Sequence, residues 1–399
     1  MQESTLPIVK PESHRAFATL ALGWLLLAGC ESGPQKHNIP PTVVITKGPS
    51  GTIATDSAVF AWAGKDLDGT VTGFWYALDD SAAKNWTEDT VLTIRKLSLG
   101  QHEFHIQAVD DSGARSSSAY RTFWVDFDSL VLPRGTDTTL EIATWNIENF
   151  PKLDDSTVNR VRALMARLDL DIYALQEIAD TLAFHRLLSG LTGYAGLYSR
   201  DDYGSFYQKT GVVYKTSVVT LTGVRQLFWG NDSVTRPPLE MTVTASYNGK
   251  TFDFRLIVLH LKAGGSSSDQ ALRRATCRLL KDYIDQALAQ GPELDFVVAG
   301  DWNDLLEDPP QWNIFQRFLD DSTNYRFLTM SLAGNTRYGS YIYTGLLIDH
   351  IMVTTDALAE YLGGITQTLR LDDEVSRYEA VVSDHRPVMS TFPVFRGLK

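Results

Sequence analysis

Six short motifs between residues 144 and 387 carry side chains that can bind a metal ion or move a proton. Each follows or closes a run of Val, Ile, Leu, Phe or Tyr residues that predicts a buried strand. The motifs therefore predict carboxylates, amides and imidazoles gathered at strand ends. They are Thr144–Phe150, Leu175–Glu177, Val258–Lys262, Gly300–Asp304, Ile348–Ile351 and Ser383–Pro387.

These residue types favour hydrolysis of a phosphoester with the help of a hard divalent cation. Attack of water on an anionic phosphodiester builds negative charge on oxygen, so the reaction needs a cation, a base for the water and hydrogen-bond donors for the phosphoryl oxygens. The motifs contain no cysteine and no two-histidine helical pattern, which argues against a zinc site. Mg²⁺ prefers oxygen ligands, and the motifs supply them from Glu148, Glu177, Asp301, Asn303, Asp349 and Asp384.

Spacing within the motifs indicates which side chains can meet. Alternate residues of a strand point to the same side, and Asn146 and Glu148 are two residues apart. The same spacing separates Asp301 from Asn303, so each pair can converge on one cavity at a strand end. His350 directly follows a motif carboxylate and therefore points to the opposite face, so we interpret it as a structural residue.

Together the motifs resemble, in type and in order, the endonuclease/exonuclease/phosphatase superfamily of metal-dependent phosphoesterases. The resemblance covers about residues 139–393. It implies a site for Mg²⁺ (or Mn²⁺) in which Glu177 is the principal ligand. Position 148 is often Asp in relatives and is Glu here, a longer side chain with the same charge. The residues implied to lie around the metal with Glu177 are Asn146, Glu148 and Asp384.

The same resemblance implies catalytic roles at five further positions. Asp301 would orient and deprotonate the attacking water, and Asn303 would position the phosphate. His385 would contact the phosphoryl oxygens, with Asp349 holding its ring, because a catalytic imidazole needs a carboxylate to fix its tautomer and favour its charged form. His260 would face the leaving group, which looks like the pancreatic-type deoxyribonucleases and bacterial sphingomyelinases more than the abasic-site endonucleases.

The N-terminal segment indicates export. The apolar run Ala16–Ala28 has about 13 residues, which is shorter than the roughly 20 that span a membrane and is typical of a signal peptide. It closes with Leu27-Ala28-Gly29-Cys30, which resembles a bacterial lipobox and implies a mature chain lipidated on Cys30. Glu31, in place of Asp, favours the outer membrane by the same resemblance. An uncleaved anchor or a buried apolar helix is the alternative.

Residues 42–127 have the pattern of an all-β module. Short alternating runs separated by turn residues predict an antiparallel sandwich, and Asp66–Gly69, Gly73–Tyr76 and Leu99–His102 resemble bacterial Ig-like or fibronectin-III-like modules. Its tryptophans either pack in the core, which we favour, or form a platform for a carbohydrate or a partner. The predicted strands are Thr42–Ile45, Ala58–Trp62, Val71–Leu78, Val91–Ile94, His102–Ala108 and Tyr120–Val125, and the tryptophans are Trp62, Trp75, Trp86 and Trp124.

Strand and helix patterns alternate after residue 139, which predicts an α/β domain. Ser156 is the predicted N-cap of a first helix, and Ala179–Leu191 and Asp269–Gln290 are predicted to be further helices. The superfamily resemblance implies a four-layer α/β sandwich, with two mixed sheets face to face and helices outside. The predicted organisation is a lipoprotein signal peptide at 1–29, a tether at 30–41, the Ig-like sandwich at 42–127, a linker at 128–138 and the catalytic domain at 139–395.

The formal net charge of −12 weighs against a non-specific nucleic-acid-binding protein, which usually presents a basic surface. A local basic rim can coexist with an acidic whole. Lys262 is the predicted substrate-binding cation, whereas Arg273 and Arg274 are either phosphate contacts or solvated helix charges. The candidates for the rim are Arg200, Lys209, Lys262 and Arg386.

These observations predict a membrane-anchored bacterial lipoprotein of the cell envelope that hydrolyses phosphodiester bonds with Mg²⁺ or Mn²⁺. Nucleic acid is the favoured substrate. One alternative is a sphingomyelinase-like or other phosphoester hydrolase, although no long aromatic hairpin marks the chain as a lipid-cleaving member. The other is a non-catalytic lipoprotein that uses its Ig-like module in adhesion or assembly.

Overall fold

The computed structural model describes residues 37–125, except 54, 56, 83, 96 and 99, together with residues 131–200 and 208–396. The predicted signal peptide at 1–29, Cys30 and most of the predicted tether lie outside the described residues, as does the start of the predicted linker. Among the helices of the described ranges, none combines the length and the apolar character needed to cross a membrane.

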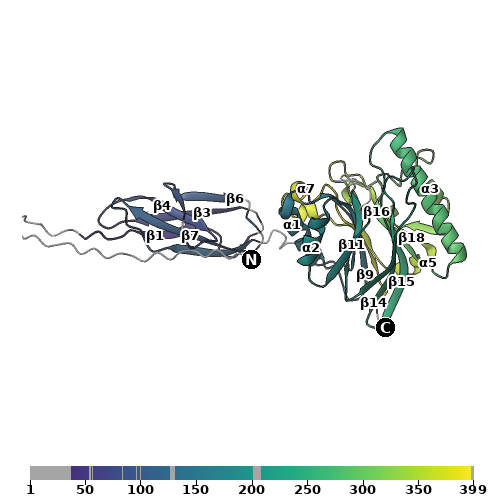
Figure 1. Cartoon of the computed structure of the whole chain (residues 1–399), viewed down its shortest axis with the longest axis horizontal. Coiled ribbons are helices and arrows are strands. Elements are labelled where there is room, and N and C mark those ends of the chain that lie inside the picture. The colour runs from purple at the N-terminus through teal and green to yellow at the C-terminus, as the bar shows by residue number, and fades with distance from the viewer. Residues whose placement is uncertain are drawn as a thin grey trace, which may run out of the picture.

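Two β-sheets form the N-terminal part of the described chain (Figure 1). Their strand orders are β1-β3-β6 and β2-β8-β7-β4-β5. They bury a core in which the rings of Phe60 and Phe104 stack with centroids 4.1 Å apart. The predicted strands are all present, while β2 and β5, too short to give a periodic signal, are additional. The assignment to the Ig-like class stays a prediction. The strands are β1 (Thr42–Lys47), β2 (Thr52–Ile53), β3 (Ser57–Lys65), β4 (Val71–Leu78), β5 (Asn85–Thr87), β6 (Val91–Arg95), β7 (Gly100–Asp110) and β8 (Ala119–Val125).

The tryptophans of this module have different environments. Trp62 is buried, and its ring centroid lies 5.8 Å from that of Phe74. Trp86 and Trp124 are 42% and 45% exposed, so the prediction that they pack in the core is wrong. Strand alternation gives the reason for Trp124, since it follows the inward-pointing Phe123 and must face outward.

Two six-stranded sheets form the C-terminal part, with strand orders β11-β12-β10-β9-β20-β19 and β13-β14-β15-β16-β18-β17. Both sheets are mixed, because β9 runs parallel to β10 in the first and β15 runs parallel to β16 in the second. The strands are β9 (Leu140–Phe150), β10 (Ile172–Ile178), β11 (Tyr194–Tyr198), β12 (Lys209–Lys215), β13 (Val219–Gln226), β14 (Leu239–Tyr247), β15 (Lys250–His260), β16 (Phe296–Asp301), β17 (Tyr325–Phe327), β18 (Asp349–Thr354), β19 (Thr366–Thr368) and β20 (Val388–Phe392).

Three apolar cores hold these sheets and helices in layers. Ile142 of β9 and Leu256 of β15 belong to the core between the sheets. Trp145 of β9 packs with Leu164 of α1 on the outer side of the first sheet, and Leu280 of α3 packs on the outer side of the second. In Figure 1, α1 and α2 accordingly lie on one side of the paired sheets and α3 on the other. The predicted α/β class, with mixed sheets and outer helices, is confirmed. The helices are α1 (Asp154–Leu168), α2 (Thr181–Ser189), α3 (Ser267–Gln290), α4 (Gln316–Leu319), α5 (Thr355–Tyr361), α6 (Leu371–Glu374) and α7 (Tyr378–Val381), with 3₁₀ helices η1 (Leu328–Leu332) and η2 (Thr336–Tyr338).

The polar motifs gather along one edge of the paired sheets, which we call the motif edge. Asp301 at the end of β16 pairs in register with His260 on one side and with Asp349 on the other. Asp349 begins β18 and residues 383–387 precede β20, so the prediction that every motif follows or closes a strand is wrong for these two. Since β18 and β20 run antiparallel to β16 and β9, their starts lie at the edge where β16 and β9 end.

The helix starts are set by side chains close to this edge. The predicted cap Ser156 lies inside the first turn of α1, so that prediction is wrong. The hydroxyl of Thr157 instead accepts a hydrogen bond from the backbone N–H of Leu153 at 2.8 Å. Ser266 and Asp269 form a capping box that starts α3 two residues earlier than predicted. This box fixes the direction of α3 where the chain leaves β15.

A pair of carboxyl groups is buried in the first sheet, away from the motif edge. Glu141 on β9 is fully buried, and its Oε1 accepts a hydrogen bond from the Thr139 hydroxyl while its Oε2 has no partner. Asp171 lies beside it and accepts a hydrogen bond from the Glu141 backbone N–H at 3.2 Å. Burial, with the Asp171 carboxylate adding to it, raises the pKa of Glu141 to about 8.

Glu141→Gln is expected to raise the free energy of unfolding at pH 8 by about 1–2 kcal/mol. Because the pKa of Glu141 in the folded chain lies above its ordinary value of 4.5, the folded chain keeps a proton that the unfolded chain releases. The stability of the wild-type chain therefore falls as the pH rises from 4.5 to about 8, and the neutral amide removes this loss. Urea unfolding at pH 5 and pH 8 checks it, and an equal gain at both pH values would contradict the titration as the cause.

Candidate active site

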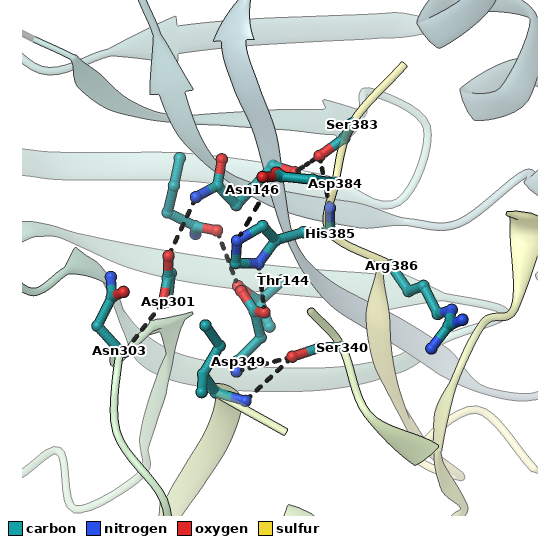
Figure 2. Close-up of polar contacts among 12 residues, drawn as sticks. Thr144, Asn146, Asp301, Asn303, Ser340, Asp349, Ser383, Asp384, His385 and Arg386 are labelled. Atoms are coloured by element: carbon teal, nitrogen blue, oxygen red, sulfur yellow. Dashed lines mark hydrogen bonds and ion pairs between the residues drawn. The ribbon is translucent and has the colours of Figure 1, made fainter. Parts of the chain in front are cut away.

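The Asn146 side chain joins the two sheets at the motif edge (Figure 2). Its amide Nδ2 donates hydrogen bonds to Glu177 Oε1 at 3.2 Å and to Asp301 Oδ2 at 3.0 Å. Glu177 lies near the end of β10 in the first sheet, and Asp301 ends β16 in the second. One amide therefore fixes two carboxylates that come from different sheets.

A second group of acidic side chains adjoins Asn146. The backbone N–H of Glu148 donates to Asn146 Oδ1 at 3.0 Å, and Glu148 Oε2 accepts hydrogen bonds from Lys152 Nζ and, at 2.8 Å, from the backbone N–H of Asp384. Burial, with the Glu148 and Glu177 carboxylates adding to it, raises the pKa of Asp384 to about 6. The structure thus brings the four residues predicted to surround a metal into one hydrogen-bonded network.

Several residues of this edge adopt left-handed backbone conformations that side chains other than glycine seldom adopt. The φ angles are 36° at Glu148, 47° at Asn149, 65° at Glu177 and 54° at Asn303. Such conformations cost about 1–3 kcal/mol each and persist where surrounding contacts hold them. One such contact runs from the backbone N–H of Asn149 to Glu177 Oε2 at 2.8 Å. The strain is concentrated where side chains must leave the regular strands and converge.

His385 and Asp349 form a buried pair, with His385 Nδ1 2.7 Å from Asp349 Oδ2 (Figure 2). The Ser340 hydroxyl accepts a hydrogen bond from the backbone N–H of Asp349 at 3.1 Å. The Ser383 hydroxyl accepts from the backbone N–H of His385 at 2.9 Å and donates to the carbonyl of Asn146 at 2.7 Å. These contacts fix the imidazole through Nδ1 and leave Nε2 for another partner.

The donor atoms of this edge fit a divalent cation. One oxygen each of Asp301 and Asp349 and a ring nitrogen of His385 lie within 4.8 Å of one another, and all three residues are buried. Asp349 Oδ1 has no hydrogen-bond partner. Burial, followed by the Asp349 carboxylate, raises the pKa of Asp301 to about 7. A cation bound at this edge would lessen the repulsion between the carboxylates. The oxygen atoms available at this edge belong to Asp301 and Asp349 and to the adjoining Asn146, Glu148, Glu177 and Asp384.

The two histidines of the edge differ in charge. Burial disfavours the charged His385 ring, but the Asp349 carboxylate outweighs it and raises the pKa of His385 to about 10. Burial, with the Arg236 guanidinium adding to it, holds the pKa of His260 well below its usual range. His260 Nε2 lies 3.6 Å from Asp301 Oδ2. At neutral pH the edge therefore presents one cationic and one neutral imidazole, which is the kind of separation that assigns different tasks to similar groups.

His350 lies behind the edge, as predicted for a structural residue. Its Nε2 is 3.0 Å from the carbonyl oxygen of Asp304, and its Nδ1 is 3.1 Å from the Thr329 hydroxyl. The ring is fully buried, with its centroid 5.4 Å from that of Phe315. Both nitrogens are engaged inside the protein, so the structural interpretation is confirmed.

The predicted basic rim is largely engaged elsewhere. Arg386 is buried and donates to both carboxylate oxygens of Asp372, at 2.7 and 2.6 Å. Arg273 is buried and donates to Asp304 at 2.9 Å. Lys209 is buried as well. Arg386 and Arg273 are therefore part of the internal scaffold, so Arg273 is neither a phosphate contact nor a solvated helix charge, and the burial of Lys209 and Arg386 argues against their place in the predicted rim. A sequence window does not reveal that a distant carboxylate will pair with a cation.

Lys262 and Asn303 lie beside the edge and have local partners. Lys262 Nζ donates to the Ala263 carbonyl at 2.7 Å and lies 3.2 Å from Asp269 Oδ1. The Asn303 backbone N–H donates to Asp301 Oδ1 at 2.9 Å, and its side-chain amide donates to the Leu261 carbonyl at 3.2 Å. The Asn303 amide keeps a second N–H for a phosphoryl oxygen.

Three residues that support the site were not singled out from the sequence: Ser340, Ser383 and Lys152. Ser383 stands in the motif that carries His385, so its hydroxyl was visible as a candidate. Ser340 lies in a segment with no periodic pattern, and no sequence signal pointed to it. Lys152 follows Glu148 by four residues, but this spacing predicts a contact between side chains only on a helix, and Glu148 lies at a strand end.

Ser383→Ala is expected to lower the free energy of unfolding by about 1–3 kcal/mol and kcat by about 10-fold or more. The change leaves the His385 N–H and the Asn146 carbonyl without their partner and loosens the imidazole. Ser390→Ala is the matched control, because Ser390 is fully buried on β20 with its hydroxyl 2.8 Å from that of Thr366. The control should lose stability and keep its kcat. An unchanged kcat in Ser383→Ala would contradict the positioning role.

Comparison with solved structures finds similar folds. D. rerio TDP2 complexed with single-strand DNA product is 15% identical with a TM-score of 0.48, covering 64% of this chain and 99% of that one. The human Nocturnin catalytic domain is 16% identical with a TM-score of 0.48, covering 64% and 94%. A Bacteroides thetaiotaomicron mannosyl-6-phosphatase is 17% identical with a TM-score of 0.46, covering 63% and 98%.

Comparison with curated proteins finds no match. The family model described as the Endonuclease/Exonuclease/phosphatase family matches residues 143–385. This range contains every motif residue discussed above from Asn146 to His385, including the buried Asp301, Asp349 and His385 group. The chain therefore belongs to the endonuclease/exonuclease/phosphatase family, and residues 143–385 form a phosphoesterase domain of that family.

Proposed function

We propose that the chain is a divalent-metal-dependent nuclease that hydrolyses phosphodiester bonds at the bacterial cell envelope. The observation that carries the chemistry is the buried Asp349–His385 pair beside Asp301, whose carboxylate shares the Asn146 amide with Glu177. A Mg²⁺ or Mn²⁺ ion bound at this edge supplies positive charge to the phosphoryl oxygens. Its ligands in this proposal are Glu177, Asn146, Glu148 and Asp384.

Each remaining residue takes a role that its surroundings permit. Asp301, with a pKa raised to about 7, accepts the proton of the attacking water. The cationic His385 donates from Nε2 to a phosphoryl oxygen, and Asp349 keeps Nδ1 protonated and the ring in place. Asn303 donates its amide to the phosphate. The neutral His260 lies next to Asp301 and faces the leaving group.

Nucleic acid is the substrate we favour, with Lys262 as a further phosphate contact. The net charge of −12 favours a second candidate, a phospholipid or small phosphoester, because it repels a long polyanion outside any basic patch. The two candidates share the same chemistry at the edge. They differ in what holds the substrate beyond the reacting phosphate.

The substrate panel that separates them uses the full chain purified in detergent. Plasmid DNA, RNA, sphingomyelin and bis(p-nitrophenyl) phosphate are offered with Mg²⁺, with Mn²⁺ and with chelator, beside the Asp301→Asn variant. Metal-dependent cleavage of DNA or RNA that disappears in the variant is expected. Release of phosphocholine with nucleic acid left intact selects the second candidate. Absence of any turnover that the variant abolishes favours a substrate outside this panel or the non-catalytic, adhesive lipoprotein.

The lipobox at Leu27–Cys30 supports a lipid anchor on Cys30 in the outer membrane. Cells fed radiolabelled palmitate should label the wild-type chain and not Cys30→Ala. The wild-type chain should also sediment with outer membranes after fractionation. A wild-type chain that takes up no label would refute the anchor and leave the proposed chemistry untouched.

A further inference from the structure

A cavity of about 480 Å³ lies beside α3, between this helix and residues 312–317. Its polar walls include Arg274, Arg278 and Arg317, and the Trp312 side chain completes the lining. None of the described residues that line it is acidic. Because the whole chain carries a net charge of −12, a cavity lined by three guanidinium groups, of which only that of Arg317 has a carboxylate partner within the ranges that the structure describes, is a local exception that favours an anionic ligand.

The walls of this cavity are held in place by their own hydrogen bonds. The Arg274 guanidinium donates to the carbonyl oxygen of Trp312 at 2.9 Å, and the Gln270 amide donates to the same oxygen at 3.0 Å. The backbone at Trp312 is therefore fixed to α3, while 58% of the tryptophan surface stays exposed. An exposed indole on a fixed backbone is a preformed surface on which a planar group can stack.

The arginines differ in how free they are. Arg274 and Arg278 are one helical turn apart and lie on the same side of α3. Arg278 is exposed and has no hydrogen bond or ion pair within the described part of the chain. Arg317 pairs with Asp282 at 2.8 Å, with both side chains half exposed, so this contact is weak and open to replacement by a phosphate.

The cavity is connected to the motif edge through both of its walls. Helix α3 follows β15, which ends at His260, and the segment with Trp312 follows β16, which ends at Asp301. The buried Arg273–Asp304 pair joins α3 to the segment that follows β16. Arg273 also donates to the carbonyl of Gly264 at 2.8 Å, which ties α3 to the loop that follows β15. Arg278 lies about 16 Å along α3 from its first residue. A ligand that occupies both places must therefore be long enough to follow α3 from its start.

We propose that this cavity is an accessory subsite for single-stranded nucleic acid whose scissile bond lies at the motif edge. A base stacks on Trp312, and Arg278 and Arg317 hold phosphates of the same strand. Alternation of an aromatic surface with guanidinium groups suits a strand that repeats base and phosphate. A phosphocholine head group fits less well, because the guanidinium groups repel its ammonium. The inference rests on the proposed nuclease function and adds the place where the strand is held.

The test compares Trp312→Ala and Arg278→Gln with the wild-type full chain on a single-stranded oligonucleotide and on bis(p-nitrophenyl) phosphate. Arg326→Gln on β17, also exposed and outside the cavity, is the matched charge control. For the oligonucleotide, KM should rise about 10-fold or more in Trp312→Ala with kcat nearly unchanged. The salt dependence of KM should weaken by about 0.7 in log–log slope in Arg278→Gln. Hydrolysis of the small substrate should not change in any variant.

The possible failures are distinguishable. If the wild-type chain cleaves the oligonucleotide and both cavity variants keep its KM, the subsite is refuted while the nuclease function stands. If the wild-type chain leaves nucleic acid intact and hydrolyses another phosphoester, the nuclease function falls and the subsite falls with it. If the variants keep the oligonucleotide KM but lose binding to phosphatidylglycerol vesicles, the cavity contacts a membrane surface, and the nucleic-acid subsite is refuted.

Discussion

Asp349→Asn should lower kcat by about 10³–10⁴-fold while the dissociation constant of the metal changes by less than about 3-fold. The substitution keeps the size of the side chain and removes its charge. Asp349 accepts from His385 Nδ1 at 2.7 Å, and its carboxylate is what raises the pKa of His385 to about 10. Without that charge the ring loses both its fixed tautomer and the preference for the cationic form that donates to a phosphoryl oxygen.

The measurement pairs single-turnover hydrolysis with calorimetric titration of Mn²⁺ into the enzyme alone. The control is Glu141→Gln, which removes a fully buried carboxyl group from β9, away from the motif edge, and should keep the wild-type kcat. The structure also allows a different outcome, because Asp349, Asp301 and His385 together have the spacing of a metal site. If Asp349→Asn loses its metal affinity by 10-fold or more, Asp349 is a ligand and not the residue that orients the histidine.

The sequence was sufficient to predict that these residues gather as a group, because their order follows the strands. Asp301 ends a strongly apolar strand, Asn146 and Glu177 lie in the last part of two others, and such runs are the most reliable local signal. The motif with Asp349 was recognised although its strand begins, and does not end, at Asp349. A polar motif beside an apolar run looks the same in the sequence whichever way the strand runs. Strand direction itself had no local signal, which is why two motifs were assigned to the wrong end of their strands.

Cations were harder to assign than carboxylates. Arg273 and Arg386 look like phosphate contacts in the sequence, yet each pairs with a carboxylate, that of Asp304 and that of Asp372 respectively. An arginine near a site is used either for substrate or for the scaffold, and the choice depends on a partner that the tertiary fold supplies. By the same argument, the sequence did not distinguish Arg278, which has no partner among the described residues and is open to a ligand.

The link between the two sheets was also invisible to sequence patterns. Asn146 and Asp301 are 155 positions apart in the chain, and only the packing of the sheets lets one amide bind the carboxylates of both Asp301 and Glu177. This arrangement has a functional consequence. Any change in the spacing between the sheets would separate Glu177 from Asp301, so the apolar core between the sheets sets the geometry of the reaction.

Glu177→Gln should reduce the affinity for the metal by about 100-fold or more and kcat/KM by about 10³-fold at a fixed low metal concentration. The carboxylate is partly buried, with Oε1 bonded to the Asn146 amide and Oε2 bonded to the Asn149 N–H. Glutamine keeps the shape, but its NH₂ faces one of these donors, so the charge and one hydrogen bond are lost together.

Activity at rising Mg²⁺ concentration separates the two effects. Recovery of kcat at saturating metal would mean that Glu177 acts through binding alone, whereas a persistent deficit would mean that it also holds Asn146 and hence Asp301 in position. A Glu177→Gln variant that keeps the metal affinity of the wild-type chain would exclude Glu177 from the metal ligands. Glu141→Gln again serves as the control for loss of a buried carboxyl group.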